Sequence, residues 1–261
     1  MEIKFTNYNH KENYLNFEIG QSEIIGITGK TKEELIDIIS LRKINKGTIT
    51  IDSKKITKDK INEYRKKISI IEKNLNTHHL DVQNLINEYV IRNKLIIKNP
   101  DKKIEDSLKI VGLSKEILKR KIKTLSTSET KLLQISISLL SNPEILIIEE
   151  PFKFIDKQIE KKLITLFRRL KDQFYKTIIF ISDDSNILHK YTTKIFFIKN
   201  SSIVLSGKTE EEYLKVDFLV KNKFEIPDIV EFTCLAKKKK QVKIDYHKDI
   251  RDIIKDIYKH I

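Results

Sequence analysis

The stretch that decides the fold is Ile-Leu-Ile-Ile-Glu-Glu-Pro, residues 145–151. Four consecutive aliphatic residues are typical of a strand that is buried on both faces of a parallel sheet. The stretch places two carboxylates, Glu149 and Glu150, at the carboxyl end of that strand, where open α/β sheets bind ligands. One acid there can hold a metal-bound water while its neighbour orients an attacking water. The alternative is an ordinary strand that runs into an acidic turn.

Similar aliphatic runs recur along the chain and alternate with amphipathic helical patterns. This alternation predicts an α/β fold with a largely parallel sheet and one antiparallel piece. Further strands are predicted at residues 24–27, 48–52, 68–71, 177–181, 195–198 and 203–205, and helices from Thr31, over 132–140 and over 159–170. The antiparallel piece contains the strand at 48–52, which follows a glycine.

The chain divides into three parts by its sequence patterns. Residues 1–74 and 125–210 are predicted to form the α/β core. Residues 75–124 contain no convincing strand and several helical patterns, so they are predicted to be a helical subdomain inserted into the core. Residues 211–261 form a predicted C-terminal helical extension, which we expect to be interrupted by the run of lysines at 237–240.

Composition excludes several classes of protein. The N-terminus lacks the apolar core of a secretory signal, no apolar stretch approaches the roughly 18 residues that span a bilayer, and Cys234 is the single cysteine. A reducing cytoplasm is therefore expected. The formal net charge is +14, but acids and bases are interleaved, and the one clean basic run is 237–240. This distribution favours a solvated surface over a clustered nucleic-acid footprint.

Other motifs surround the acid pair in a characteristic order. Leu-Ser-Thr-Ser-Glu at 125–129 precedes it, Asp156 follows five residues after the stretch, and Ile-Ser-Asp-Asp at 181–184 follows the next predicted strand. This order resembles the signature loop, Walker B strand, D-loop and switch-histidine loop of ABC-type ATPases. The resemblance implies a P-loop NTPase-like ABC ATPase core with the inserted helical subdomain and the C-terminal helical extension.

The C-terminal segments at 226–230 and 249–258 resemble the extension of energy-coupling factor transporter ATP-binding proteins. Those proteins work in pairs beneath a membrane scaffold that takes up vitamins or metal ions. The resemblance implies a related ABC ATPase as dimer partner, in a homodimer or heterodimer, and a membrane-embedded transporter subunit. It also implies a cytoplasmic location, peripheral on the inner face of the cell membrane, and the cofactors ATP and Mg²⁺ if nucleotide binding survives.

The phosphate loop departs from the family pattern G-x-x-x-x-G-K-[ST], whose glycines let backbone N–H groups wrap the phosphates. Gly26 and Lys32 have the correct offset, but Thr31 then stands at the inner glycine and Glu33 at the magnesium hydroxyl. The alternative register is the literal Gly29-Lys30-Thr31, which has no glycine six residues before its lysine. Both registers remain open in the sequence, and intact nucleotide cradling is not expected from either.

The remaining family positions are also mostly substituted. The resemblance places Glu149 where the family holds a magnesium-bound water and Glu150 where it has the catalytic base. Lys73 stands at the position of the Q-loop glutamine, and Asp183 stands at the position of the switch histidine. Ser126 and Ser128 belong to the signature loop, and Asp156 matches the D-loop aspartate. Tyr8 matches the aromatic residue that stacks on adenine in the family, although packing explains a lone aromatic equally well.

The substitutions are concentrated at positions that contact phosphate, whereas the hydrophobic frame is kept. The sequence therefore predicts an ABC transporter ATP-binding subunit, of the energy-coupling factor type, with weak or lost ATP hydrolysis. An alternative is a non-catalytic structural or regulatory partner of an active ABC ATPase. A second alternative, suggested by the net charge, is a nucleic-acid-associated ABC ATPase. Relatives of that kind usually carry two cassettes or a long coiled coil, so nucleic acid is not an expected partner.

Overall fold

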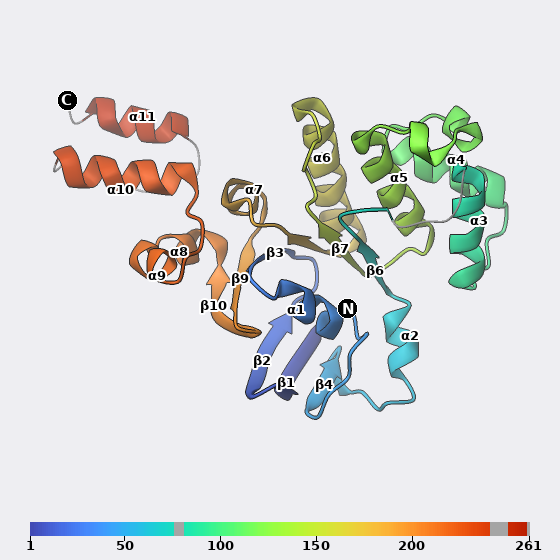
Figure 1. The fold of residues 1–261 in the computed structure, drawn as a ribbon, viewed down its shortest axis with the longest axis horizontal. Helices are drawn as coiled ribbons and strands as arrows, with labels where there is room; N and C mark the ends of the chain where they lie inside the picture. Colours follow the sequence, from blue (N-terminus) through green and yellow to red (C-terminus); the bar gives the residue numbers. More distant parts are fainter. Residues whose placement is uncertain (76–80, 241–249, 260–261) are drawn as a thin grey trace.

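A computed structural model describes residues 1–75, 81–240 and 250–259 (Figure 1). Parts of the predicted helical subdomain (76–80) and of the predicted C-terminal extension (241–249 and 260–261) lie outside the described residues. The fold is α/β, as the sequence predicts. It is built on a six-stranded sheet of order β10-β9-β3-β8-β7-β6 and a four-stranded antiparallel sheet of order β2-β1-β4-β5.

The six-stranded sheet is parallel except at one edge, where β10 pairs with β9 as an antiparallel hairpin. Its strands are β3 (Ile24–Gly29), β6 (Ile68–Ile71), β7 (Ile145–Glu149), β8 (Thr177–Ile181), β9 (Lys194–Lys199) and β10 (Ser202–Lys208). The predicted runs match these strands closely, because parallel strands covered on both faces are aliphatic at every position.

The two faces of this sheet are covered by different layers. In β7, Ile145 and Ile147 belong to one hydrophobic cluster, while Leu146 and Ile148 belong to the other. Alternate residues of a strand point to opposite faces, so an uninterrupted aliphatic run is required where both faces are covered. One cluster also contains the antiparallel sheet and α1, and the other contains the apolar residues of α5 and α6.

The antiparallel sheet consists of β1 (Ile3–His10), β2 (Asn13–Ile19), β4 (Thr48–Ile51) and β5 (Lys54–Lys55). Sequence reasoning located only β4. In β1 the pairing with β2 shifts register between Phe5 and Tyr8, and Asn7 there has a positive φ of 47°. Phe5 and Tyr8 are therefore both buried although they stand three positions apart. This β-bulge breaks the period of two by which a strand is recognised.

Helices fill the spaces around both sheets. They are α1 (Lys32–Ile39), α2 (Ile61–Arg65), α3 (Val82–Arg92), α4 (Pro100–Ile110), α5 (Thr127–Leu140), α6 (Lys157–Phe174), α7 (Ser185–Tyr191), α8 (Thr209–Tyr213), α9 (Val216–Lys221), α10 (Asp228–Lys240) and α11 (Ile250–Lys259), with 3₁₀ turns at Lys115–Lys119 and Ile122–Thr124. Helices α3 and α4 lie at one end of the molecule, and α10 and α11 lie at the other (Figure 1).

The C-terminal helices correct one expectation. The lysine run at 237–240 does not interrupt the helix, since α10 continues through Lys240. Lysine is a good helix former, and its charge repulsion along one turn costs only a few tenths of a kcal/mol per pair. Among the helices of the described ranges, none combines the length and the apolar character that crossing a membrane requires.

Candidate functional site

The connection between β3 and α1 is short. Strand β3 ends at Gly29 and α1 begins at Lys32, so only Lys30 and Thr31 lie between them. Thr31 has a positive φ of 65°, and its hydroxyl accepts a hydrogen bond of 2.9 Å from the backbone N–H of Ser201. A phosphate cradle needs several consecutive N–H groups turned toward one point. Here the connection itself supplies only two residues, and the hydroxyl of one of them, Thr31, is bonded to the β9–β10 turn.

The glycines of this segment have packing roles. Gly29 has a φ of 110°, and a Cβ atom there would lie 2.1 Å from the carbonyl oxygen of Ile198 in the neighbouring strand. Gly26 lies within β3, where a Cβ atom would meet Thr192 and Leu188 at 3.2 and 3.3 Å. Both glycines are therefore explained by close approach to neighbouring elements, without any phosphate.

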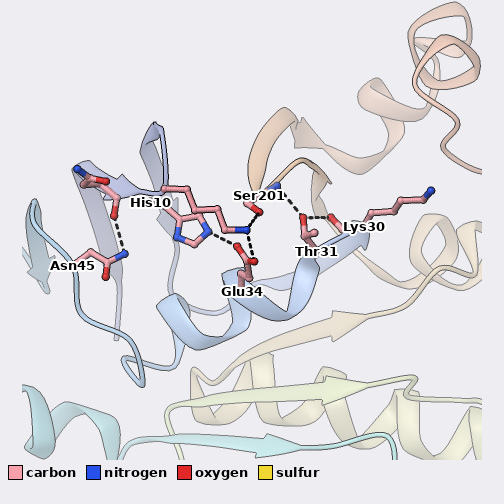
Figure 2. A network of polar contacts seen from close by, with 8 residues as sticks. His10, Lys30, Thr31, Glu34, Asn45 and Ser201 are labelled. Carbon is pink, nitrogen blue, oxygen red and sulfur yellow. Dashed lines mark hydrogen bonds and ion pairs between the residues drawn. The ribbon is translucent and has the colours of Figure 1, made fainter.

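The two candidate lysines differ sharply in their surroundings. Lys32 is the first residue of α1, its side chain is only 12% exposed, and its Nζ lies 2.5 Å from Oδ1 of Asp183. Lys30 is exposed, and Figure 2 shows its side chain extending away from the neighbouring polar network. The aspartate at the family's switch-histidine position thus pairs with the lysine of the first register. A carboxylate of the chain neutralises the cation that a phosphate would otherwise meet.

The two acids of the Ile145–Pro151 stretch have separate partners. Glu149 Oε2 accepts a hydrogen bond of 2.9 Å from the backbone N–H of Lys73. Glu150 has a positive φ of 46°, and its Oε2 accepts a hydrogen bond of 3.1 Å from the hydroxyl of Ser182. The structure brings Lys73 and Glu149 together at the carboxyl edge of β6 and β7, through the backbone of Lys73 and not its ammonium group.

The N-terminus of α5 is also occupied by a carboxylate of the chain. Ser126 caps the helix, and its hydroxyl accepts from the backbone N–H of Glu129 at 3.1 Å. Glu129 in turn accepts from the backbone N–H of Ser126 at 2.8 Å and pairs with Arg120. The backbone bond from Ser126, and then Arg120, hold the pKa of Glu129 below its ordinary value. This capping box satisfies the helix dipole that would attract an anion.

The other signature and D-loop residues have structural partners. The hydroxyl of Ser128 donates to the carbonyl oxygen of Phe154 at 3.1 Å. Asp156 caps α6, since its Oδ1 accepts from the backbone N–H groups of Gln158 and Ile159, both at 2.9 Å. Asp156 is thus an ordinary N-cap in this structure.

Tyr8 does not present its ring to a ligand. It is fully buried, its hydroxyl donates to the carbonyl oxygen of Lys43 at 2.8 Å, and the same hydroxyl accepts from the N–H of Asn45 at 2.8 Å. Its ring packs edge-on against Phe5. Burial raises the pKa of the Tyr8 hydroxyl, and the bond from Asn45 partly opposes that rise. Of the two interpretations left open by the sequence, the structure favours packing.

A polar network missed by sequence reasoning fixes the short β3–α1 loop (Figure 2). Glu34 of α1 accepts from Lys11 at 2.6 Å and contacts His10 Nε2 at 2.7 Å, both in or beside the β1–β2 turn. Lys11 also donates to the hydroxyl of Ser201 at 3.0 Å, and the backbone of Ser201 bonds Thr31. The bond from Lys11 is the main cause that lowers the pKa of Glu34 to about 2. The loop is therefore held from outside by two turns that lie far apart in sequence.

A buried lysine, Lys131, links α5 to the carboxyl ends of β6 and β7. It is 5% exposed, and its Nζ donates to the carbonyl oxygens of Glu149 at 3.0 Å and Glu72 at 3.3 Å. Burial lowers the pKa of Lys131 to about 8. One signal was present in the sequence: Lys131, Gln134 and Ser138 recur at helical spacing among the aliphatic residues of α5, which is compatible with a buried polar stripe.

The acidic residues at this edge have partners within the chain. Over the ranges that the structure describes, no group of three or more His, Cys, Asp or Glu side chains is placed to hold a metal ion. A hard divalent cation takes several oxygen ligands. Glu149 is bonded to Lys73, and Glu33 replaces the hydroxyl that the family pattern provides. Within the described ranges the side chains therefore do not form a complete metal cage by themselves, and a Mg²⁺ ion bound together with a nucleotide would take most of its oxygen ligands from phosphates and water.

The sequence of the chain is similar to a known protein family and to individual proteins of that family. The sequence profile of a family described as "ABC transporter" matches residues 13–153. The energy-coupling factor transporter ATP-binding protein EcfA2 of Staphylococcus aureus (strain MRSA252) is 28% identical over 253 residues, which cover 92% of this chain and 88% of the relative. EcfA1 of Ligilactobacillus salivarius is 28% identical over 222 residues, covering 82% and 76%.

Solved structures share the fold at lower identity. CbiO1 from Clostridium perfringens, described as part of the ABC transporter complex cbiONQ, is 20% identical with a TM-score of 0.67, covering 88% of this chain and 98% of that one. The dimeric ATP-binding cassette MJ0796, in a post-hydrolysis state bound to ADP and Pi, is 21% identical with a TM-score of 0.65, covering 79% and 98%. The profile match extends over more than half of the chain, and this chain therefore belongs to the ABC transporter family.

Proposed function

We propose that the chain is an ABC transporter ATP-binding subunit of an energy-coupling factor-type uptake transporter, with weak or lost ATP hydrolysis of its own. The relatives named as energy-coupling factor ATP-binding proteins, matched over most of both chains, support the transporter class. In this proposal the subunit pairs with a related ABC ATPase and docks, from the inner face of the cell membrane, on a membrane-embedded transporter subunit.

The observation that carries the loss of hydrolysis is that carboxylates of the chain occupy both anion-binding positions. Asp183 pairs with Lys32 at the start of α1, and Glu129 occupies the N-terminus of α5. In an ABC dimer a composite site joins the phosphate loop of one chain to the signature loop of the other. In this proposal, both surfaces that the chain contributes to such sites already hold a carboxylate, which opposes the approach of a nucleotide phosphate.

The same two contacts favour a second candidate, a non-catalytic structural or regulatory partner of an active ABC ATPase. In that case the chain supplies a dimer surface and a membrane-docking surface without turnover. Glu150 separates the candidates, because a subunit with residual hydrolysis needs its carboxylate as the base. That carboxylate accepts from Ser182 in the present arrangement.

The experiment is calorimetric titration of the purified chain with ATP, with and without Mg²⁺. The nucleotide-binding subunit is supported if the chain binds ATP at micromolar concentration in a magnesium-dependent way and if Lys32→Ala removes that binding. Lys30→Ala is the matched control, since the side chain of Lys30 is exposed and points away from the polar network around Thr31. If hydrolysis accompanies that binding, Glu150→Gln should abolish it and leave binding intact. Absence of binding up to millimolar ATP contradicts a nucleotide-binding role and leaves the non-catalytic candidate.

A further inference from the structure

We propose that a pocket at the amino edge of the six-stranded sheet binds a nucleoside monophosphate, whose base stacks on exposed aromatic rings and whose phosphate meets lysines. We call it the amino-edge pocket, and its cavity volume is about 380 Å³. Pockets for small ligands usually enclose about 300–1,000 Å³. The inference goes beyond the proposed function, which concerns the carboxyl edge of the same sheet. The lining combines three cations, one acid and two aromatic rings, namely Lys66, Lys67, Lys176, Glu144, Phe174 and Tyr175.

The pocket is built from residues that come just before three neighbouring strands. Lys66 and Lys67 precede β6, and Glu144 precedes β7. Lys176 comes immediately before β8. Backbone bonds join these segments, since the N–H of Glu144 donates to the carbonyl oxygen of Lys67 at 2.7 Å and the N–H of Thr177 donates to that of Glu144 at 3.0 Å. The five residues of β7 separate this edge from the carboxyl edge by roughly 16 Å.

Tyr175 has a backbone conformation that its side chain disfavours. It is the C-cap residue of α6, with a φ of 53° and a ψ of 31°, the left-handed conformation that glycine adopts most easily at a helix end. A bulky side chain is strained there. Tyr175 is nevertheless 65% exposed, so packing within the chain offsets little of the strain. Strain of this kind at an exposed ring points to a ligand as the partner of that ring.

Phe174 supplies a second exposed ring at the same pocket. It is the last residue of α6 and is 52% exposed, and the guanidinium of Arg169 lies 5.9 Å from the centre of its ring. Every nucleobase has a planar face that stacks on an aromatic side chain, and removal of one such ring commonly weakens binding by about tenfold or more. The pair of Phe174 and Tyr175 therefore suits a planar ligand.

The lysines of the pocket are only partly neutralised. Lys67 is paired with Glu144 at 3.0 Å. Among the residues that the structure describes, Lys66 has no ion-pair partner, and the Nζ of Lys176 donates only to the carbonyl oxygen of Asn142 at 3.4 Å. Burial lowers the pKa of Lys176, and Glu144 partly opposes this effect. A phosphate beside these two lysines therefore stabilises charge that the chain leaves without a carboxylate.

The charge balance favours a single phosphate group. Ser141 and Tyr175 are the C-cap residues of α5 and α6, and both line the pocket. The carboxyl end of a helix carries a partial negative charge of about half a unit. Two such ends, together with Glu144, reduce the positive potential of the three lysines. A triphosphate carries more negative charge than this balance can compensate.

The aromatic rings select against other anions. Inorganic phosphate, an acidic peptide or a lipid headgroup can meet the lysines, but none of them supplies a planar partner for the rings. Gln21, Ser141 and Asn142 also line the pocket and provide hydrogen-bond donors and acceptors for a sugar or for the edge of a base. A nucleoside monophosphate is the ligand that uses the rings, the polar side chains and the cations together.

The test is calorimetric titration of the full chain with AMP in the absence of Mg²⁺. Tyr175→Gly removes the ring and the backbone strain together, so we expect at least a tenfold loss of affinity with no fall in the midpoint of urea unfolding. Tyr175→Phe keeps the ring and should change the affinity less than twofold. Tyr14→Ala is the matched control, because it removes an exposed ring of β2 outside the pocket, and it should also change the affinity less than twofold.

A charge reversal tests the cations. Lys66→Glu should weaken AMP binding at least tenfold, whereas Lys55→Glu, at an exposed residue of β5 outside the pocket, should change it less than twofold. Inorganic phosphate and ATP should each bind more weakly than AMP. Photolabelling with azido-AMP should modify the peptide that contains Phe174 and Tyr175.

Four results overturn the inference. The first is absence of AMP binding up to millimolar concentration, and the second is an affinity for inorganic phosphate equal to that for AMP. The third is photolabelling at the β3–α1 connection in place of the amino-edge pocket, which would assign AMP to the site of the proposed function. The fourth is a lower urea midpoint for Tyr175→Gly, which would show that the ring serves the stability of the fold.

Discussion

Replacing Tyr8 by phenylalanine distinguishes a packing role from an adenine-stacking role. Phenylalanine keeps the aromatic face, so a stacking residue tolerates the change, whereas the buried hydroxyl is lost. That hydroxyl bridges the carbonyl oxygen of Lys43 and the N–H of Asn45, both at 2.8 Å. The perturbation therefore removes two hydrogen bonds and leaves the ring packing against Phe5 in place.

The expected cost follows from the groups left behind. Removing one partner of a buried hydrogen bond costs about 1–3 kcal/mol, because the remaining group is neither solvated nor paired. Tyr8→Phe leaves the carbonyl of Lys43 and the N–H of Asn45 without this partner, in positions that are only partly buried. The segment around Lys43 can relax and share part of the cost, so we expect a loss of about 2–4 kcal/mol in the free energy of unfolding.

Urea unfolding followed by far-UV circular dichroism measures this loss. With a denaturant slope of about 3 kcal/mol per molar urea, the midpoint should fall by roughly 0.7–1.3 M. Tyr14→Phe is the matched control, because Tyr14 lies in the neighbouring strand with 69% of its side chain exposed, and its midpoint should not move. An unchanged midpoint for Tyr8→Phe would refute the reasoning.

Three further changes test other contacts. Gly29→Ala should lower the free energy of unfolding by about 3–5 kcal/mol, because Gly29 has a φ of 110° and the new Cβ would lie 2.1 Å from the carbonyl oxygen of Ile198. Gly112→Ala is the control, because the space around Gly112 is open, and it should cost only about 1–2 kcal/mol in thermal or urea unfolding. The pKa of Lys131 is lowered from 10.5 to about 8 in the folded state, so the unfolded chain binds more protons between these two pH values. The free energy of unfolding should therefore rise by up to about 3 kcal/mol as the pH increases from 8 to 10.5. Lys131→Met should abolish this rise, and a rise that persists in the variant would contradict the assignment of the effect to Lys131. The folded-state pKa of Glu34 is lowered from 4.5 to about 2, so its contribution is present above pH 4.5 and lost as pH falls through 2; acid unfolding curves should show that loss vanish in Glu34→Gln.

The sequence predicts the parallel sheet well and the antiparallel sheet poorly, for a physical reason. Strands such as β7, at Ile145–Glu149, are covered on both faces and are therefore recognisable in the sequence as aliphatic runs. In β1, at Ile3–His10, the bulge between Phe5 and Tyr8 shifts the buried positions, so neither a run nor a clean alternation appears. Local pattern reveals a strand only where its neighbours leave the pattern undisturbed.

The candidate site is predicted only in its positions. The order of motifs indicates which residues lie at the carboxyl edge of the sheet, but not which residues they form hydrogen bonds or ion pairs with. The pairing of Lys32 with Asp183 joins residues far apart in sequence, and the binding of Thr31 by the backbone of Ser201 depends on where a distant turn lies. Such contacts depend on three-dimensional placement that spacing does not encode. For Lys131 the helical spacing indicates at most a buried polar position, and its partners, the carbonyl oxygens of Glu72 and Glu149, depend on the fold as well.

The pair formed by Lys32 and Asp183 makes the chain a competitor of any anion that approaches α1. A carboxylate tethered within the same molecule acts at an effective concentration of millimolar order or above, whatever the concentration outside. If the pair is closed about 99% of the time, the apparent dissociation constant of a competing phosphate is about 100-fold larger than the intrinsic one. Occupancy of this position by a competing anion would then change little when the concentration of that anion changes severalfold.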